Sequence, residues 1–311
     1  MTGLAPLIVI LGPTASGKSA LGLELAKKLN GEILVCDSTQ LYRHFDIGTG
    51  KIPPAEQQGI AHHLVDLLDP EEIFTAGEYR RRALQVLDDL RRRKKLPIIT
   101  AGTGLYLRAL LEGLADTPER SAEIRDRLRA SAQLHGAAHL HRLLTRLDPE
   151  SAARIAPPDT QKIIRAIEMR LVAGKSATEI HRSGRTPLEG YQPIRIGLAP
   201  PREALYQRIH SRIDAMIQAG WIEEVAQLVK NGIPADAKPF QFIGYSEWRA
   251  FLAQKFSKDE ALQKIRQSTR RYAKRQLTWF RREPDVHWLA GFGDAPEISR
   301  AAFEISNSQI S

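Results

Sequence analysis

The residue types and spacing at positions 12–19 predict a phosphate-binding loop. The stretch GPTASGKS matches the pattern G-x-x-x-x-G-K-[ST], in which glycines let the backbone wrap an anion and the lysine bridges its oxygens. The last hydroxyl of such a loop can ligate Mg²⁺. The residues expected to bind phosphate oxygens are Gly12, Pro13, Thr14, Ala15, Ser16, Gly17, Lys18 and Ser19. The pattern leaves open whether the bound phosphates are transferred or expelled.

A carboxylate follows the next apolar run of the chain. Residues 33–36 are ILVC, and Asp37 comes directly after them. In parallel sheets, ligands bind at the carboxyl ends of the strands, so Asp37 is placed where a ligand would lie. Its side chain could accept a proton from an incoming nucleophile, hold a metal ion as a Walker-B aspartate does, or cap a turn with Ser38.

A second glycine-containing loop follows a later apolar run. Residues 100–106 are TAGTGLY, and the two glycines allow the backbone to approach a ligand closely. Thr103 offers a hydroxyl within this loop. The alternative is a simple glycine turn that leads into a helix.

Short apolar runs that alternate with helical patterns predict an α/β fold. The predicted strands are residues 7–11, 33–36, 97–101 and 194–198, with a weaker fifth at 63–68. Helical patterns lie between them, at residues 19–29 and 76–94. The fold expected is a P-loop NTPase-like core, in which a parallel sheet is flanked by helices.

The middle of the chain is expected to be a helical insertion. Strand signals stop at residues 119–184, where apolar residues recur at three- and four-residue spacing. Further helices are predicted at 203–219, 221–230 and 259–282, and the last dozen residues are expected to be frayed. We therefore predict a core of residues 1–112 and 191–311, which includes basic C-terminal helices, and an insertion domain of residues 113–190.

Composition and charge favour a polyanionic partner. The 311 residues carry 45 Lys and Arg against 36 Asp and Glu, a formal net charge of +9. Residues 264–282 hold eight basic side chains and no acidic one. The single cysteine, Cys36, excludes an internal disulfide and a cysteine-rich zinc site, and it favours a reducing compartment such as the cytoplasm. No apolar run reaches the length of a membrane span, so no membrane partner is expected. His62 and His63 lack a third ligand at suitable spacing, which favours a structural role.

Seven stretches, in this order along the chain, resemble the tRNA dimethylallyltransferases, also called isopentenyl-tRNA transferases. They are GPTASGKS (12–19), CDSTQLYRHFDIGTGK (36–51), HHLVDLLDP (62–70), AGTGLYLRALLEG (101–113), DTQKIIRAIE (159–168), FIGYSEW (242–248) and TRRYAKRQLTWFR (269–281). The resemblance implies transfer of a dimethylallyl group from its diphosphate to the exocyclic N6 amine of the adenosine that is 3′-adjacent to a tRNA anticodon. The partners implied are tRNA and dimethylallyl diphosphate, and we also expect Mg²⁺ as the cofactor and a monomeric protein.

The resemblance assigns roles to individual residues. The phosphate loop and Arg212 would hold the departing diphosphate with Mg²⁺ on Ser19, while Asp37 accepts the proton of the amine and Thr103 lies close by. The residues implied to contact the tRNA anticodon stem-loop or its target nucleotide are Ser38, Thr39, Gln40, Arg125, Gln161, Lys162, Ile163, Ile164, Arg165, Gln241, Gly244 and Tyr245. A basic stripe of Arg270, Lys274 and Arg281 would neutralise RNA phosphates.

The sequence departs from the family pattern at three positions. Lys162 replaces a common arginine, Ser246 replaces a basic residue, and Ala101 replaces a glycine. These changes concern individual tRNA contacts more than the chemistry. The alternatives are a P-loop kinase of small molecules, a prenyltransferase that acts on free adenine nucleotide, and an RNA-binding protein with a nucleotide switch. The basic insertion and the basic C-terminal helix argue against the first two.

Overall fold

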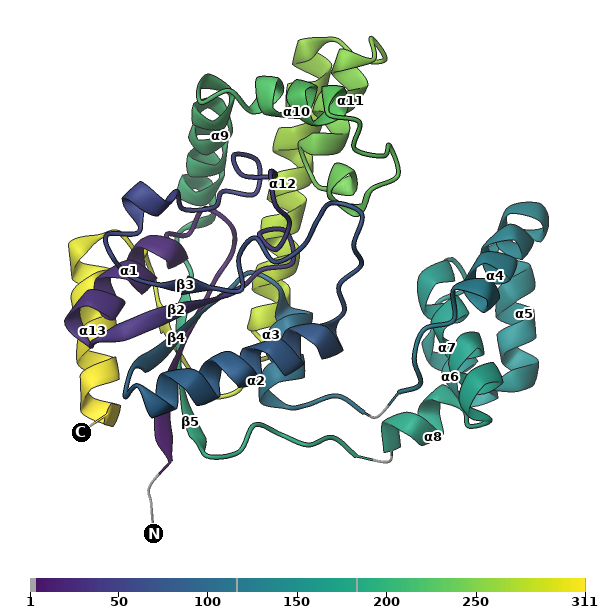
Figure 1. The fold of residues 1–311 in the computed structure, drawn as a ribbon, viewed down its shortest axis with the longest axis horizontal. Coiled ribbons are helices and arrows are strands. Elements are labelled where there is room, and N and C mark those ends of the chain that lie inside the picture. The colour runs from purple at the N-terminus through teal and green to yellow at the C-terminus, as the bar shows by residue number, and fades with distance from the viewer. Residues whose placement is uncertain (1–3, 116, 183, 311) are drawn as a thin grey trace. The chain divides into compact units, whose positions relative to one another are not determined.

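The computed structural model describes residues 4–115, 117–182 and 184–310. The chain divides into two compact units (Figure 1). One unit contains the chain up to Leu110 together with the chain from Glu189 onward, and we call it the sheet unit. The other is Leu111–Leu188, which we call the helical unit.

A six-stranded parallel sheet forms the centre of the sheet unit. Its strands are β1 (Ala5–Leu11), β2 (Gly31–Cys36), β3 (His62–His63), β4 (Leu96–Ala101), β5 (Tyr191–Leu198) and β6 (Val286–Leu289), in the order β3-β2-β4-β1-β5-β6. Ala101 is paired with both Leu11 and Cys36, so β1, β2 and β4 end level with one another. The loops that begin at Gly12, Asp37 and Gly102 therefore leave the same edge of the sheet. This architecture confirms the predicted fold class.

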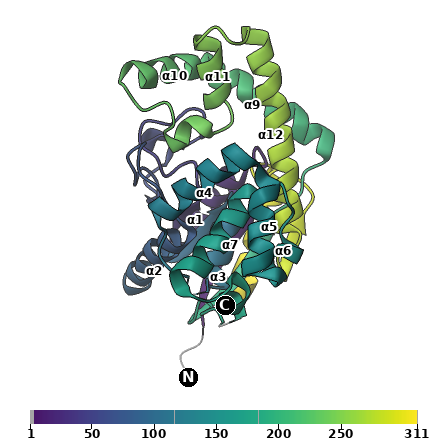
Figure 2. The ribbon, with the colours of Figure 1, turned by 90° about the vertical axis from the view of Figure 1, so that its right-hand side faces the viewer.

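Helices cover the sheet and extend beyond its carboxyl edge. They are α1 (Lys18–Lys28), α2 (Ala76–Arg92), α3 (Gly104–Leu111), α9 (Arg202–Gln218), α10 (Trp221–Lys230), α11 (Tyr245–Leu252), α12 (Lys258–Phe280) and α13 (Pro296–Ile310), with short 3₁₀ turns η1 (Pro54–Glu56) and η2 (Lys238–Gln241). Alternate strand residues such as Ile8 and Ile10 pack with Leu21 and Leu25 of α1 and Ala302 of α13. The long α12 runs beside α11 and reaches back toward the sheet (Figures 1 and 2).

Two predictions about this unit are wrong at its margins. The strand expected at residues 63–68 is only His62–His63, because Leu64 and Asp66 have positive φ and turn the chain. The residues up to Ile310 are not frayed but form α13, whose Ala302 and Ser306 are fully buried; Ser311 lies outside the described residues. Both adjacent histidines make local bonds: His63 Nε2 lies 2.8 Å from Glu32 Oε2, and His62 Nδ1 lies 2.9 Å from the Ile60 carbonyl.

The helical unit is built from five helices with its own apolar core. They are α4 (Ala122–His135), α5 (Ala137–Leu147), α6 (Pro149–Arg154), α7 (Thr160–Ala173) and α8 (Ala177–Arg182). Leu140 and Leu144 of α5 pack in one cluster with Ile163 and Ile167 of α7. The N-termini of α4, α6 and α7 are capped by Ser121, Asp148 and Asp159, each accepting a backbone N–H of the first turn. Within the described residues, no helix combines the length and apolarity needed to cross a membrane.

Candidate active site

A pocket of about 1080 Å³ opens at the carboxyl edge of the sheet, within the sheet unit. The phosphate loop, the segment after β2, α9 and α12 all contribute to its walls. The residues predicted from the sequence that line it are Thr14, Ala15, Ser16, Gly17, Lys18, Ser19, Asp37, Ser38, Thr39, Gln40, Arg212 and Gln241. The structure thus brings together, in one cavity, residues that are up to 227 positions apart (14 to 241) in the chain.

The phosphate loop is closed by contacts with a distant part of the chain. The backbone N–H of Gly293 donates to the Ser16 carbonyl at 2.9 Å. A Cβ atom at Gly17 would lie 2.7 Å from Gly293 N and from an Asp294 carboxylate oxygen, and Gly17 has φ +86°, so only glycine fits here. Ser16 is fully buried, and its Oγ has no hydrogen-bond partner among the described residues. That orphaned hydroxyl is available to an anion in the loop.

Two cations converge on the pocket. Lys18 Nζ donates to the carbonyls of Gly12 and Pro13, each at 2.8 Å. Desolvation inside the pocket lowers the pKa of Lys18 to about 7, although Asp37 pulls it upward, and repulsion by Arg212 lowers it further. Desolvation also lowers the pKa of Arg212. A bound anion would relieve this repulsion, so the site favours a ligand of high negative charge.

Asp37 follows β2 and is held by its neighbours. Its Oδ1 accepts hydrogen bonds from the N–H and the hydroxyl of Thr39, at 2.9 and 2.7 Å. Between described residues, no hydrogen bond reaches Oδ2. A Cβ atom at Gly102 would lie 2.2 Å from that Oδ2, so the glycine leaves the room that the carboxylate occupies. One oxygen thus fixes the orientation of Asp37, and the other remains available for proton transfer or a metal ion.

Thr103 supports Ser38 and is not part of the pocket wall. Its Oγ1 accepts from the Ser38 N–H at 2.9 Å and donates to Ser38 Oγ at 3.2 Å. Its own N–H and that of Gly102 donate to the Cys36 carbonyl, at 2.9 and 3.0 Å. Thr103 therefore lies close to Asp37, as predicted, because it is bonded to both chain neighbours of Asp37: the Cys36 carbonyl and Ser38.

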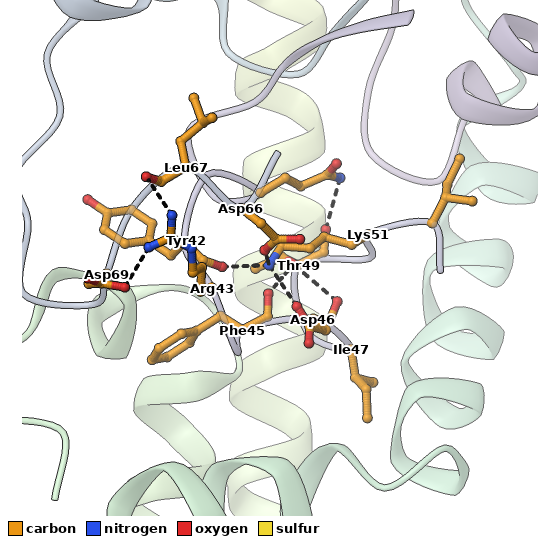
Figure 3. A network of polar contacts seen from close by, with 12 residues as sticks. Tyr42, Arg43, Phe45, Asp46, Ile47, Thr49, Lys51, Asp66, Leu67 and Asp69 are labelled. Carbon is orange, nitrogen blue, oxygen red and sulfur yellow. Dashed lines mark hydrogen bonds and ion pairs between the residues drawn. The ribbon is translucent and has the colours of Figure 1, made fainter. Parts of the chain in front are cut away.

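A lysine organises the loop that follows Asp37 (Figure 3). The side chain of Lys51 is only 6% exposed, and its Nζ donates to the Tyr42 carbonyl, Asp46 Oδ1 and Asp66 Oδ1 at 2.5, 2.7 and 2.5 Å. Gln40 crosses the same loop, and its Nε2 donates to the Thr49 carbonyl at 3.2 Å. The loop that carries Ser38, Thr39 and Gln40 thus has a defined shape before any substrate binds.

A second anchor ties this loop to the helices beyond the sheet. Glu224 Oε2 accepts the N–H groups of Asp46 and Ile47, at 3.0 and 2.8 Å. Glu224 Oε1 accepts the Tyr245 hydroxyl at 2.6 Å, and that hydroxyl accepts the Gly48 N–H at 3.1 Å. Nothing in the residue spacing pointed to Lys51 or Glu224, although Lys51 lies within one of the stretches that carry the resemblance.

Gly244 and Tyr245, both predicted to contact tRNA, have structural partners within the sheet unit. Tyr245 is fully buried and its hydroxyl is bonded to Glu224, so its side chain supports the loop. A Cβ atom at Gly244 would lie 1.9 Å from the Trp221 ring, so this glycine makes room for the indole. Gln241, from the same stretch of sequence, does line the pocket.

Two more residues predicted to contact tRNA, in the helical unit, have buried side chains. Ile163 is 0% and Ile164 is 5% exposed, and both belong to the apolar core of the unit. Gln161 and Lys162, which directly precede them on α7, are exposed, and Lys162 pairs with Asp159. Only these polar residues of the Gln161 to Ile164 run present their side chains at the surface.

Arg125 and Arg165 bind a buried carboxylate. Glu168 is 0% exposed; it accepts from Nε and Nη2 of Arg125, at 2.9 and 3.0 Å, and from Nη1 of Arg165 at 2.7 Å. The Ser121 N–H also donates to it, at 2.8 Å. Burial alone would raise the pKa of Glu168, but these hydrogen bonds together hold it below its ordinary value. Both arginines therefore have a structural partner, which the sequence analysis did not foresee.

Substitution of Glu168 by glutamine is expected to loosen the helical unit. Breaking a buried ion pair from one side costs about 3–5 kcal/mol, because the opposing charge stays behind. Hydrogen exchange measured by mass spectrometry should show faster exchange in α4 and α7, with the sheet unit unchanged. Glu123→Gln is the matched control, since the Glu123 side chain on α4 is 83% exposed. Equal protection of α4 and α7 from exchange in both variants would show that Glu168 does not stabilise the helical unit.

The basic stripe lies on α12. Lys274 and Arg281 are exposed, while Arg270 is partly buried beside His210, whose Nε2 is 3.5 Å from Arg270 Nη1. Four other α12 residues line the pocket and were not predicted to act there: Thr269, Tyr272, Arg275 and Gln276. The same helix therefore has a basic surface and a face that reaches the pocket.

The donor set suits a metal ion that takes most ligands from its substrate. Within the described part of the chain, no group of three or more His, Cys, Asp or Glu side chains could hold a metal ion. Ser19 is exposed to the pocket, and Asp37 lines it. Mg²⁺ typically keeps several waters and binds substrate phosphates through few protein oxygens, so these residues fit it in the presence of a diphosphate.

Comparisons with known proteins agree on one family. The family model described as IPP transferase matches residues 40–283. A tRNA dimethylallyltransferase of Solibacter usitatus is 47% identical over 299 residues, covering 96% of this chain and 97% of the relative. The corresponding protein of Koribacter versatilis is 49% identical over 300 residues, with the same coverage of both chains.

Solved structures show the same similarity. A full-length tRNA isopentenylpyrophosphate transferase of Bacillus halodurans superposes with a TM-score of 0.71 at 36% identity, covering 98% of this chain and 95% of the other. A eukaryotic dimethylallyltransferase, captured acting on tRNA, gives a TM-score of 0.85 at 28% identity, with 98% and 79% coverage.

Proposed function

This chain belongs to the IPP transferase family, and from that premise we propose that it is a tRNA dimethylallyltransferase. It transfers a dimethylallyl group from dimethylallyl diphosphate to the exocyclic N6 amine of the adenosine 3′-adjacent to the anticodon, and pyrophosphate is released. One juxtaposition supports this function above all: Lys18, Arg212 and Asp37 line a single pocket. Cations for a leaving group and a carboxylate for a nucleophile are the two requirements of such an alkyl transfer.

The phosphate loop holds the group that leaves. As the allylic C–O bond breaks, its electron pair passes to the diphosphate, whose negative charge grows. Lys18, Arg212 and the backbone of residues 12–19 are already in place to stabilise that charge. Mg²⁺ bound through Ser19 and the diphosphate would supply further charge neutralisation. The loop thus serves an expelled diphosphate, not a transferred phosphate.

Asp37 serves the incoming nucleophile. An exocyclic aromatic amine is a weak nucleophile, and it must lose a proton as its nitrogen bonds to the allylic carbon. Oδ2 of Asp37 accepts that proton, while Oδ1 stays fixed by Thr39. Thr103 keeps Ser38 in position beside the target base. The amine nitrogen thus loses one proton to the Asp37 carboxylate and gains one bond to the dimethylallyl carbon, while the electron pair of the broken C–O bond leaves with pyrophosphate.

Several surfaces are suited to tRNA. Ser38, Thr39, Gln40 and Gln241 line the pocket that receives the target nucleotide. Neighbouring bases in a stack keep the enzyme from reaching the target adenine, so the target adenosine must be flipped outward into the pocket. The stripe of Arg270, Lys274 and Arg281 neutralises phosphates, and the insertion of residues 113–190 binds the anticodon stem through exposed groups such as Gln161 and Lys162. We further propose that the enzyme acts as a monomer.

A labelling experiment tests the function. The protein is incubated with Mg²⁺, radiolabelled dimethylallyl diphosphate and unmodified tRNA that carries adenosine next to the anticodon, and label is expected in RNA. ATP with candidate metabolites tests a small-molecule kinase, and AMP as acceptor tests a prenyltransferase of free nucleotides. Label in AMP but never in RNA, or phosphorylation of a metabolite, would overturn the proposal.

Neutralising the basic stripe should weaken tRNA binding and flatten its salt dependence. A triple substitution of Arg270, Lys274 and Arg281 by glutamine removes up to three phosphate contacts, so the slope of log K against log salt should fall by about 2–3. Binding is measured at several salt concentrations. The control is the same change at Lys27, Lys28 and Arg92, which are exposed and lie away from the phosphate loop. Identical slopes for both triple variants would exclude the stripe from the interface.

A further inference from the structure

One side chain of α12 joins the two loops that carry the chemistry. Gln276 is 6% exposed, and both ends of its amide are bonded. Its Oε1 accepts the Thr14 N–H at 2.7 Å, and its Nε2 donates to the Gly102 carbonyl at 2.8 Å. Thr14 belongs to the phosphate loop, whereas Gly102 lies against the carboxylate of Asp37.

The two bonds require an amide in one orientation. A backbone N–H needs an acceptor and a backbone carbonyl needs a donor, and a glutamine offers one of each. The reversed amide would place a donor against the Thr14 N–H and an acceptor against the Gly102 carbonyl. An ionised glutamate would keep the first bond and lose the second. A methionine of similar length would lose both, and would leave two polar backbone groups without this partner.

The surrounding helix holds Gln276 rigidly. Ala273 is 1% exposed and Phe280 is fully buried, so this face of α12 is packed against the rest of the unit. Tyr272, one turn earlier, also directs its hydroxyl to the Gly102 carbonyl, at 3.4 Å. The position of the amide is therefore set by the helix and not by a flexible loop.

We propose that Gln276 is a positioning residue that fixes the spacing between the phosphate loop and Asp37. This inference rests on the proposed function, because it concerns the alignment of the leaving diphosphate with the amine that attacks. Gln276 acts through the backbone of Thr14 and Gly102, so it need not touch either substrate. Alignment matters strongly in such a displacement, since an error of about 1 Å can lower the rate by about 10²-fold.

Gln276→Met tests the proposal through the rate of chemistry. At saturating tRNA and dimethylallyl diphosphate, the single-turnover rate is expected to fall by about 10- to 100-fold. The Kd for tRNA should stay within about twofold of wild type, and thermal unfolding shows that the variant is folded. Gln263→Met is the matched control, because Gln263 is exposed on the same helix, 13 residues away (276 − 263). A rate equal to that of wild type in the folded variant would overturn the proposal.

Gln276→Glu provides a second test that a loss of stability would not mimic. When protonated, the introduced carboxyl group can donate to the Gly102 carbonyl and accept from the Thr14 N–H, as the amide does. When ionised, it cannot donate. The rate relative to wild type at the same pH should therefore rise as the pH falls. A ratio that is independent of pH would contradict the assigned role, even if Gln276→Met failed to fold.

A double-mutant cycle separates positioning from general damage. In an Asp37→Asn background there is no carboxylate to align, so Gln276→Met should lower the rate by much less than it does alone. Fully additive effects would show that Gln276 does not act through the Asp37 loop. Wild-type enzyme run in parallel distinguishes the two proposals. The proposed function fails if the wild type alkylates no RNA, whereas this inference fails if the wild type alkylates RNA and the Gln276 variants give any of the contrary results named above.

Discussion

Asp37→Asn is expected to lower the single-turnover rate of prenyl transfer by about 10²- to 10⁴-fold, the range for loss of a general base. Asparagine keeps an oxygen that can accept the two hydrogen bonds from Thr39. It cannot accept the proton of the amine. The loop geometry is thus preserved while the chemistry is removed, so the Kd for tRNA should change little.

The design also separates the two chemical roles that the sequence left open for Asp37. If this carboxylate mainly held the metal, the variant would recover much of its rate at high Mg²⁺, whereas loss of a base is not relieved by metal. Asp69→Asn serves as the control, because Asp69 is exposed and pairs with Arg43 at the protein surface. Undiminished turnover of the Asp37 variant would remove it from the mechanism.

Lys18→Met is the second substitution expected to have a very large effect. Loss of one positioned donor to developing negative charge lowers kcat by about 10²- to 10³-fold. Lys18 bonds to the carbonyls of Gly12 and Pro13, so it lies within the loop that we propose receives the diphosphate. The variant should bind pyrophosphate more weakly and still bind tRNA.

The same lysine predicts a pH effect with a defined sign. The pocket lowers the pKa of Lys18 to about 7, so the free enzyme holds it largely neutral at pH 8. A bound diphosphate favours the charged form and raises that pKa, so binding at pH 8 takes up a proton and affinity falls as the pH rises above 7. Titration calorimetry in two buffers of different ionisation enthalpy measures the uptake.

The control for this experiment is Lys27→Met, which alters an exposed lysine on the same helix. It should show the proton uptake of the wild type, while Lys18→Met should lack the lysine contribution. The ligand's own ionisation is common to all three proteins and cancels in the comparison. An unchanged uptake in Lys18→Met would assign the effect to another group.

Features with a local cause could be predicted from the sequence. The run at residues 7–11, the glycine loop after it and the helix that follows are neighbours in the chain, so their pattern predicted β1, the loop and α1. Parallel strands end at one edge, and this rule placed Asp37 where a ligand would lie; the structure shows that Gly102 is beside it. The fold class followed from the same alternation.

Contacts between distant segments could not be predicted in this way. Nothing in the types of Thr14 and Gln276 indicates that they meet across 262 positions. The final helix was missed because the end of the chain was expected to be frayed. Ile298, Phe303 and Ile305 of this helix pack against the core cluster that contains Ala302. Strand β6 is four residues long and half exposed, so its periodicity is weak.

In the helical unit, residue types predicted the positions of side chains better than the tRNA-binding roles implied by the family resemblance. Ile163 and Ile164 are apolar, and their burial is what their type predicts. Arg165 and Glu168 are three positions apart on one helix, a spacing that favours an ion pair. That signal was available in the sequence, although the participation of Arg125 required the tertiary structure.

The closure of the phosphate loop by Gly293 has a consequence for synthesis of the protein. The loop is among the first segments to leave the ribosome, yet Ser16 is bonded to a residue translated about 280 positions later (293 − 16 = 277). Helix α1 and the early strands can gather while translation continues, but the anion cradle stays incomplete until the C-terminal segments emerge. A polypeptide released before residue 293 would therefore contain the whole GPTASGKS motif and lack the hydrogen bond that closes the phosphate loop.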